Sequence, residues 1–226
     1  MTGNVALSER SVFHGRMEQL SLELLADETY RRAGFDPSVP ACTMRLASTL
    51  WRDPAAVQVA PATVLRRSSA VLARVHGQRR IYIRRGCAPQ DFRFLVGHEL
   101  AHAVYADEGV TFATEDAEES ACDALAGALV APRHAFRAAV AKLGDDVEQM
   151  ALTFGTTESL CLLRLGEVTG RPLALVRPGR VRTRGEAAMP DDETIVRWAR
   201  GKAPAGWVRS ARVDGERRRV SLVFAA

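Results

Sequence analysis

Apolar side chains near the start of the chain recur at helical spacing. Residues 16–33 place leucine, methionine and tyrosine near one face among glutamate and arginine, which predicts an amphipathic helix. A shorter helix is predicted over residues 41–51, because Pro40 precedes it and apolar side chains follow at helical spacing.

Residues 71–75 and 80–84 show the alternation of strands instead. They flank the sequence His76-Gly77-Gln78, and alternation on both sides of a glycine-bearing turn predicts a β-hairpin. Gly86 is expected to end the second strand.

Two helices are predicted to follow this hairpin. The first starts near Ala88-Pro89, where the missing N–H of proline costs nothing, and stops at Gly109. The second covers residues 117–131 and ends at Pro132.

Residues 145–169 are predicted to form two short helices around a turn. This pattern is shared by DNA-binding helix-turn-helix units and by helical hairpins that pack under a core. Ala151 and Gly155 near the turn are weak evidence for the DNA-binding unit, so we expect the packing hairpin.

The last part of the chain has the pattern of strands. Residues 172–181 and 207–224 are predicted to form two strand pairs, the second folding back at Asp214-Gly215. We therefore expect an α+β protein whose main domain covers residues 1–170, with a small, mainly β extension over residues 171–226.

The predicted long helix carries the sequence His-Glu-Leu-Ala-His at residues 98–102. Side chains four residues apart lie one turn above each other on a helix, so the imidazoles of His98 and His102 can reach one ion. Neutral imidazole suits zinc, and two ring nitrogens supply half of a tetrahedral site. Glu99 is offset around the helix, where its carboxylate can deprotonate a metal-bound water as a general base. The motif predicts one Zn²⁺ per chain.

A catalytic zinc site needs a third protein ligand and one position for water. Four glutamates follow the motif: Glu108, Glu115, Glu118 and Glu119. Glu108 holds the third-ligand position of the longer H-E-x-x-H-x-x-G-x-x-H pattern, but Tyr105 replaces the glycine at which that chain turns. Glu115 and Glu118 lie in or beside an acidic loop, where we expect them in solvent.

Glu119 is the preferred third ligand, because it opens the sequence Glu119-Ser-Ala-Cys-Asp123 on the next predicted helix. Residues four apart share a helix face, so Glu119 can complete the zinc site while Asp123 accepts the far N–H of a ligand imidazole. The alternative for Glu119 is an exposed carboxylate favoured by the helix dipole. Cys122 is expected to be a small buried apolar residue rather than a ligand.

Cysteine spacing and the lack of long apolar runs narrow the class of protein. The four cysteines form no C-x-x-C pair, so we expect neither a disulfide framework nor a zinc finger, and the cytoplasm is the default location. No stretch approaches the roughly 20 apolar residues of a membrane span, and no secretory signal is visible at the start, so no membrane partner is expected.

The net charge of +4 is unevenly distributed. Residues 1–170 carry 18 Lys and Arg against 21 Asp and Glu, whereas residues 171–226 carry 13 against 6. A basic tail fits an acidic or nucleic-acid partner, but a solvated surface is the simpler explanation and the one we favour, so direct nucleic-acid binding is not expected.

Three segments together resemble the ImmA/IrrE family of zinc metallopeptidases: Ile81-Tyr-Ile, the helix with His98 to His102, and the run from Glu119 to Pro132. The resemblance covers roughly residues 40–170. It implies that the two histidines and Glu119 bind zinc and that the glutamate inside the motif is catalytic. It also implies a helix-turn-helix repressor as the protein substrate.

The chain departs from the family pattern at four positions without losing a ligand: Ala101 replaces glycine, Cys122 replaces alanine, Leu125 replaces phenylalanine and Ala131 replaces methionine. These departures leave the substrate open.

Peptidase chemistry suggests two further features. An H-E-x-x-H peptidase usually binds its substrate as an added strand at a sheet edge, and Ile81, Tyr82 and Ile83 are our candidate edge strand. A donor to the developing oxyanion is expected from Tyr105 or His134.

These patterns predict a zincin-like α+β fold and a cytoplasmic, zinc-dependent endopeptidase that cleaves a specific regulatory protein. The alternative is a non-catalytic DNA- or protein-binding regulator that keeps zinc for structure. An intact Glu99 favours the enzyme, because structural zinc needs no general base.

Overall fold

A computed structural model describes residues 21–65, 68–171, 173–177, 180–184, 191–200, 207–214 and 217–224. Residues 16–20 of the expected first helix lie outside the described residues, and residues 21–32 are helical. The chain divides into two compact units, Met1–Ala138 with Leu152–Thr157 and Ala139–Ala151 with Glu158–Ala226. The expected division at residue 170 stays a prediction.

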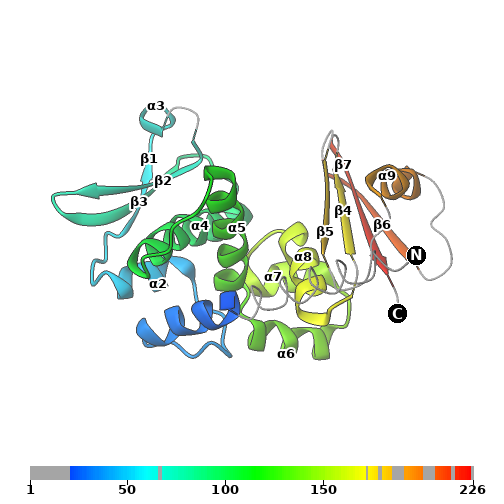
Figure 1. Ribbon diagram of the computed structural model, residues 1–226, viewed down its shortest axis with the longest axis horizontal. Coiled ribbons are helices and arrows are strands. Elements are labelled where there is room, and N and C mark those ends of the chain that lie inside the picture. Colours follow the sequence, from blue (N-terminus) through cyan, green and yellow to red (C-terminus); the bar gives the residue numbers. More distant parts are fainter. Residues whose placement is uncertain are drawn as a thin grey trace, which may run out of the picture. The chain divides into compact units, whose positions relative to one another are not determined.

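The first unit combines a three-stranded sheet with helices (Figure 1). After the helix at residues 21–32, its elements are α2 (Thr43–Leu50), β1 (Val57–Ala60), α3 (Ala62–Leu65), β2 (Ala70–Val75), β3 (Gln78–Arg84), α4 (Pro89–Asp107) and α5 (Glu115–Val130). The chain passes between the units three times: within α6 (Arg133–Leu143), within α7 (Val147–Phe154) and after Thr157.

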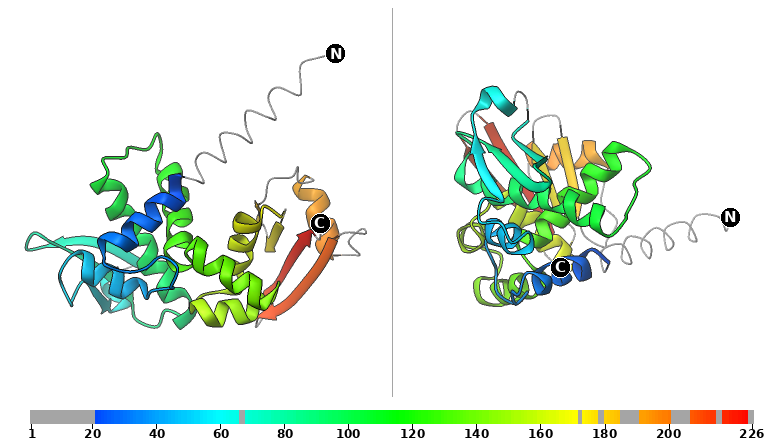
Figure 2. Two further views of the ribbon diagram at one scale, coloured as in Figure 1. Left: turned by 90° about the horizontal axis from the view of Figure 1, so that it is seen from below. Right: turned by 90° about the vertical axis from the view of Figure 1, so that its left-hand side faces the viewer.

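The predicted hairpin is confirmed as β2 and β3, which pair antiparallel with Leu72 opposite Ile81. Two residues connect the strands, His76 and Gly77, with φ of 51° and 79°. Positive φ at both positions matches a turn that follows the twist of the strands, and glycine adopts it without strain. The hairpin turn extends beyond the helices of its unit (Figure 2).

The expected edge strand is wrong. Ile81, Tyr82 and Ile83 lie in β3, which is the central strand, with β1 parallel on one side and β2 antiparallel on the other. Both isoleucines are fully buried, because their face of the sheet packs on the core. The sheet edge that contacts α4 is β2.

The long helix after the hairpin is confirmed as α4, with proline at its start and Gly109 at φ 67° just beyond its end. The next helix, α5, starts two residues earlier than predicted, because Thr114 caps it by accepting the N–H of Ala117 at 3.1 Å. The two helices pack closely where α4 has a glycine, since a Cβ at Gly97 would lie 3.4 Å from the Ala126 carbonyl oxygen.

A buried phenol ties the first helix to α5. Tyr30 is fully buried and donates its O–H to the carbonyl of Leu129 at 2.8 Å, and its oxygen accepts the N–H of Ala41 at 3.2 Å. This bond fixes the C-terminal half of α5, whose N-terminal half faces the histidines of α4.

The two short helices predicted within residues 145–169 are confirmed as α7 and α8 (Glu158–Thr169). The rest of the second unit consists of β4 (Leu173–Arg177), β5 (Arg180–Arg184), α9 (Asp192–Arg200), β6 (Trp207–Asp214) and β7 (Arg217–Phe224). The strands form an antiparallel sheet in the order β5-β4-β7-β6, and α8 and α9 both contact it. Helices α6 and α9 were not predicted.

The mixed α+β class is confirmed. Within the part of the chain that the structure describes, no helix is both long and apolar enough to cross a membrane.

Candidate metal centre

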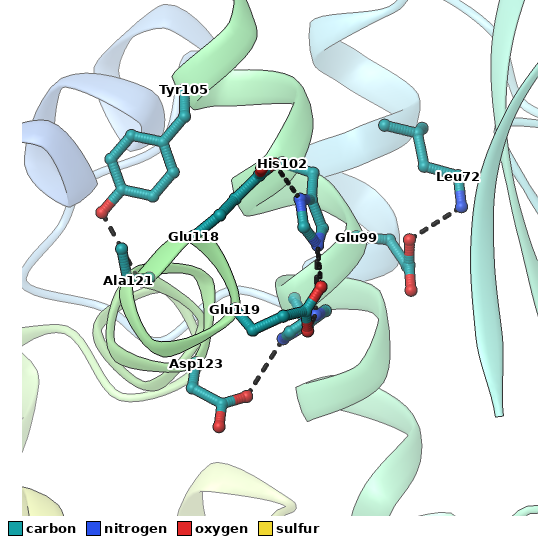
Figure 3. A network of polar contacts seen from close by, with 9 residues as sticks. Leu72, Glu99, His102, Tyr105, Glu118, Glu119, Ala121 and Asp123 are labelled. Carbon is teal, nitrogen blue, oxygen red and sulfur yellow. Dashed lines mark hydrogen bonds and ion pairs between the residues drawn. The ribbon is translucent and has the colours of Figure 1, made fainter. Parts of the chain in front are cut away.

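Helices α4 and α5 bring two histidines and a glutamate together (Figure 3). The Nε2 atoms of His98 and His102 lie 3.2 Å apart. From α5, Glu119 places Oε2 3.2 Å from Nε2 of His98 and Oε1 3.4 Å from Nε2 of His102. One ligand atom from each of the three residues lies within 4.8 Å of the others, and no second such cluster occurs among the described residues.

The spacing and chemistry of these donors fit zinc. Ligand atoms around a tetrahedral zinc with bonds of about 2.0–2.1 Å lie about 3.3 Å apart. The separations of 3.2–3.4 Å between the imidazole and carboxylate atoms match this value. Two imidazole nitrogens and a carboxylate are also the donor set of catalytic zinc sites.

Each imidazole has a separate carboxylate at its far nitrogen. Nδ1 of His98 lies 3.1 Å from Oδ1 of Asp123, and Nδ1 of His102 lies 2.9 Å from Oε1 of Glu118. The hydrogen bond to Asp123 is the main reason why the pKa of His98 is raised. With the Nδ1 protons donated to these carboxylates, both Nε2 lone pairs face the same point, where a cation would stabilise them.

Glu118 was expected in solvent, and its side chain is 43% exposed, but it also contacts His102. It precedes Glu119 by one residue, and its side chain is long enough to span the angular offset and reach His102. The antiparallel packing of α5 on α4 is the signal that could have identified Glu118. His102 lies one turn after His98 on α4, and its partner Glu118 lies five residues before Asp123, the partner of His98, on α5.

Glu99 lies beside the histidines and faces the sheet edge. Its Oε2 accepts the backbone N–H of Leu72 on β2 at 2.7 Å. Burial raises the pKa of Glu99, whereas the positive charge of His98 and the N–H of Leu72 lower it. A carboxylate in these surroundings can exchange a proton, which a general base must do.

A pocket of about 610 Å³ joins these groups. It is lined by residues of β2, by the histidines and two apolar residues of α4, and by acidic residues of α4 and α5. The lining residues are Ser68, Ser69, Ala70, Val71, Leu72, Phe94, Leu95, His98, Glu99, His102, Glu119 and Asp123. Phe94 lies next to the site, with its ring centre 6.3 Å from that of His98.

Neither expected oxyanion donor lines the pocket. The hydroxyl of Tyr105 donates to the carbonyl of Ala121 at 3.4 Å (Figure 3), and its ring packs against Phe112. His134 is mostly exposed, with its Nε2 3.8 Å from Oδ2 of Asp27. Both side chains instead have partners outside the pocket.

The remaining acidic candidates stay outside the cluster. Glu108 caps the end of α4 and forms an exposed ion pair with Arg32 at 2.6 Å. Glu115 is exposed in the first turn of α5. Cys122 is fully buried, and burial raises the pKa of its thiol to about 12, which suits a small apolar residue better than a ligand.

The two histidines of the H-E-x-x-H sequence on α4 and a glutamate of the following helix thus form one group that could hold a metal ion. Residues 60–165 match the family Peptidase_M78, described as the IrrE N-terminal-like domain, which confirms the resemblance to ImmA/IrrE proteins.

The overall fold is similar to that of a solved Mycobacterium tuberculosis transcriptional regulator. The TM-score is 0.64 at 17% identity, over 96% of this chain and 79% of the regulator. No curated protein sequence matches the chain.

Proposed function

We propose that this protein is a zinc-dependent endopeptidase that cleaves a specific intracellular protein. The observation that carries the proposal is the position of Glu99, which lines the same pocket as the His98, His102 and Glu119 cluster. A structural zinc site would have no use for a partly buried carboxylate beside it. The Peptidase_M78 match over residues 60–165 supports the same class of activity.

His98, His102 and Glu119 would hold the ion. Bound zinc supplies an acidified water and a Lewis acid for the scissile carbonyl. Glu99 would accept a proton from the attacking water at Oε1 and return it to the leaving amine. Its Oε2 would keep the hydrogen bond from the N–H of Leu72. Asp123 and Glu118 hold the two imidazoles with Nε2 toward the pocket.

The substrate would pair with β2, in place of the expected β3. The carbonyl of Ser69 accepts the N–H of Arg84, so the backbone groups of Ser69 and Val71 face β3 and those of Ala70 and Leu72 face outward. Ala70 and Leu72 both line the pocket. An extended peptide segment could therefore join the sheet with its backbone beside Glu99.

The class of substrate follows from the family resemblance, which favours a repressor-type regulatory protein. The similar transcriptional regulator has only 17% identity and supports the fold alone. All four cysteines are unpaired, which favours a reducing compartment such as the cytoplasm. We infer a zincin-like arrangement from the sheet edge, the histidine helix and the glutamate helix.

The proposal is tested by incubating zinc-loaded protein with a proteome-derived peptide library and sequencing the new termini. Wild type should produce new termini, whereas Glu99→Gln and chelated wild type should produce none. New termini in all three samples would indicate a contaminating protease and contradict the proposal. A zinc-loaded wild type that cleaves nothing would instead favour the non-catalytic regulator.

A further inference from the structure

The hydrogen bond between Leu72 and Glu99 joins strand β2 to helix α4, two elements of the site that are far apart in the sequence. The donor is a backbone N–H on the edge strand β2, and the acceptor is Oε2 of a side chain on α4, 2.7 Å away. An outward N–H on an edge strand normally bonds water or an added strand. Here it bonds the carboxylate to which we assign the proton transfer.

The position of this N–H is determined by the sheet. Leu72 pairs with Ile81 on β3, whose side chain is fully buried, and β3 is held by strands on both sides. The donor therefore belongs to paired backbone rather than to a loop. A glutamate side chain has several rotatable bonds, so one fixed donor at Oε2 greatly limits the positions that Oε1 can take.

We propose that Leu72 is a positioning residue whose main-chain N–H holds Glu99 with Oε1 directed to the reacting groups. This inference rests on the proposed function. The edge of β2 then has two roles, because the outward N–H of Leu72 bonds Glu99 and the other outward groups remain free to pair with a substrate. A bound peptide then pairs with the outward groups of Ala70 and with the carbonyl of Leu72, and leaves the Leu72 N–H to Glu99.

The bond itself is tested by amide hydrogen exchange, followed residue by residue by NMR, on zinc-loaded wild type and Glu99→Ala. Arg74 is the matched control, because its N–H points outward from the same strand, two residues further along. Loss of a charged acceptor should speed exchange at Leu72 by about 10- to 100-fold and leave Arg74 unchanged. Equal exchange at Leu72 in both proteins would overturn the inference.

The functional half is tested by replacing Leu72 with its α-hydroxy acid, which removes the N–H and keeps the side chain. On a peptide that wild type cleaves, kcat should fall about 10- to 100-fold, with KM and zinc content unchanged. A raised KM with unchanged kcat would show that the substrate binds this N–H. Unchanged kcat and KM would show that this N–H contributes neither to substrate binding nor to the reaction. Either result overturns the inference. If wild type cleaves no peptide, the proposed function fails, and the exchange experiment still decides whether Leu72 holds Glu99.

Discussion

Oε1 of Glu118 lies 2.9 Å from Nδ1 of His102, so the second histidine of the motif has a carboxylate of its own. The first histidine is matched in the same way by Asp123 at 3.1 Å. A carboxylate at the far nitrogen sets the tautomer and makes the imidazole a stronger ligand. The acidic first half of α5 thus supplies one proposed ligand, Glu119, and two groups that orient the others.

The first prediction is that Glu118→Ala weakens zinc binding by about 10- to 100-fold, as Asp123→Ala also should, because an imidazole loses its orienting partner. Glu115→Ala is the control, since Glu115 is exposed in the same first turn of α5. Competition with a chelating dye measures the affinities. The assignment of Glu118 is contradicted if its variant binds zinc as tightly as the Glu115 variant.

The motif residues were predictable because their geometry is local. Four residues make about one helical turn, so the convergence of His98 and His102 needs only the helix between them. Glu118 was missed because its role depends on how α5 packs against α4. The acidic residues around Glu118 suggested a place in solvent, but not that a second imidazole lies within its reach.

Zinc removal should lower the thermal stability of the first unit. The ion would join α4 to α5, and it binds the folded chain in preference to the unfolded one. Free zinc at 1,000 times Kd stabilises by about 4 kcal/mol, so excess chelator should lower the melting temperature by several degrees. Scanning calorimetry with and without chelator measures the effect, and the melting of Glu119→Ala should not respond to chelator. A wild type equally insensitive to chelator would contradict an occupied site.

Tyr30→Phe should destabilise the fold by about 1–3 kcal/mol, because the carbonyl of Leu129 and the N–H of Ala41 lose a buried partner. Burial raises the pKa of Tyr30 from 10.0 to about 12. A raised pKa in the folded state gives stability that is complete below pH 10.0 and declines as the pH rises toward about 12. The difference between wild type and variant should therefore narrow over this range.

Denaturant unfolding of both proteins at pH 8 and at pH 11 checks this result. The buried thiols of Cys122 and Cys161, whose pKa values are also raised to about 12, are present in both proteins and cancel in the difference. A difference that stays constant with pH would show that the Tyr30 hydroxyl does not carry it.

The fold was predictable where elements are contiguous in sequence. The β2–β3 hairpin and the start of α4 follow from His76-Gly77 and Pro89, residues that act on their immediate neighbours. The central position of β3 was missed because it depends on β1, which pairs Val57 with Ile81 across more than 20 residues of chain. A pattern of alternating side chains shows that a strand has a buried face, but not how many strands pair with it.

Phe94 should determine which side chain the pocket accepts. It lines the pocket together with Leu95, and its ring lies beside that of His98. Phe94→Ala should lower kcat/KM by roughly tenfold or more for peptides with a bulky apolar residue next to the cleaved bond, and affect small residues less. Phe112→Ala is the control, because Phe112 packs on Tyr105 and does not line the pocket. Cleavage profiles on a peptide library compare the variants, and identical profiles would rule out Phe94 as a specificity residue.

The central claim is that His98, His102 and Glu119 hold a zinc ion and that Glu99 performs the proton transfer beside it. The most direct measurement determines zinc content and peptide hydrolysis together in Glu99→Gln, Glu119→Ala and Glu115→Ala. The account predicts one zinc without hydrolysis for Glu99→Gln, neither zinc nor hydrolysis for Glu119→Ala, and both for Glu115→Ala. Hydrolysis by Glu99→Gln, or a full equivalent of zinc in Glu119→Ala, would contradict it.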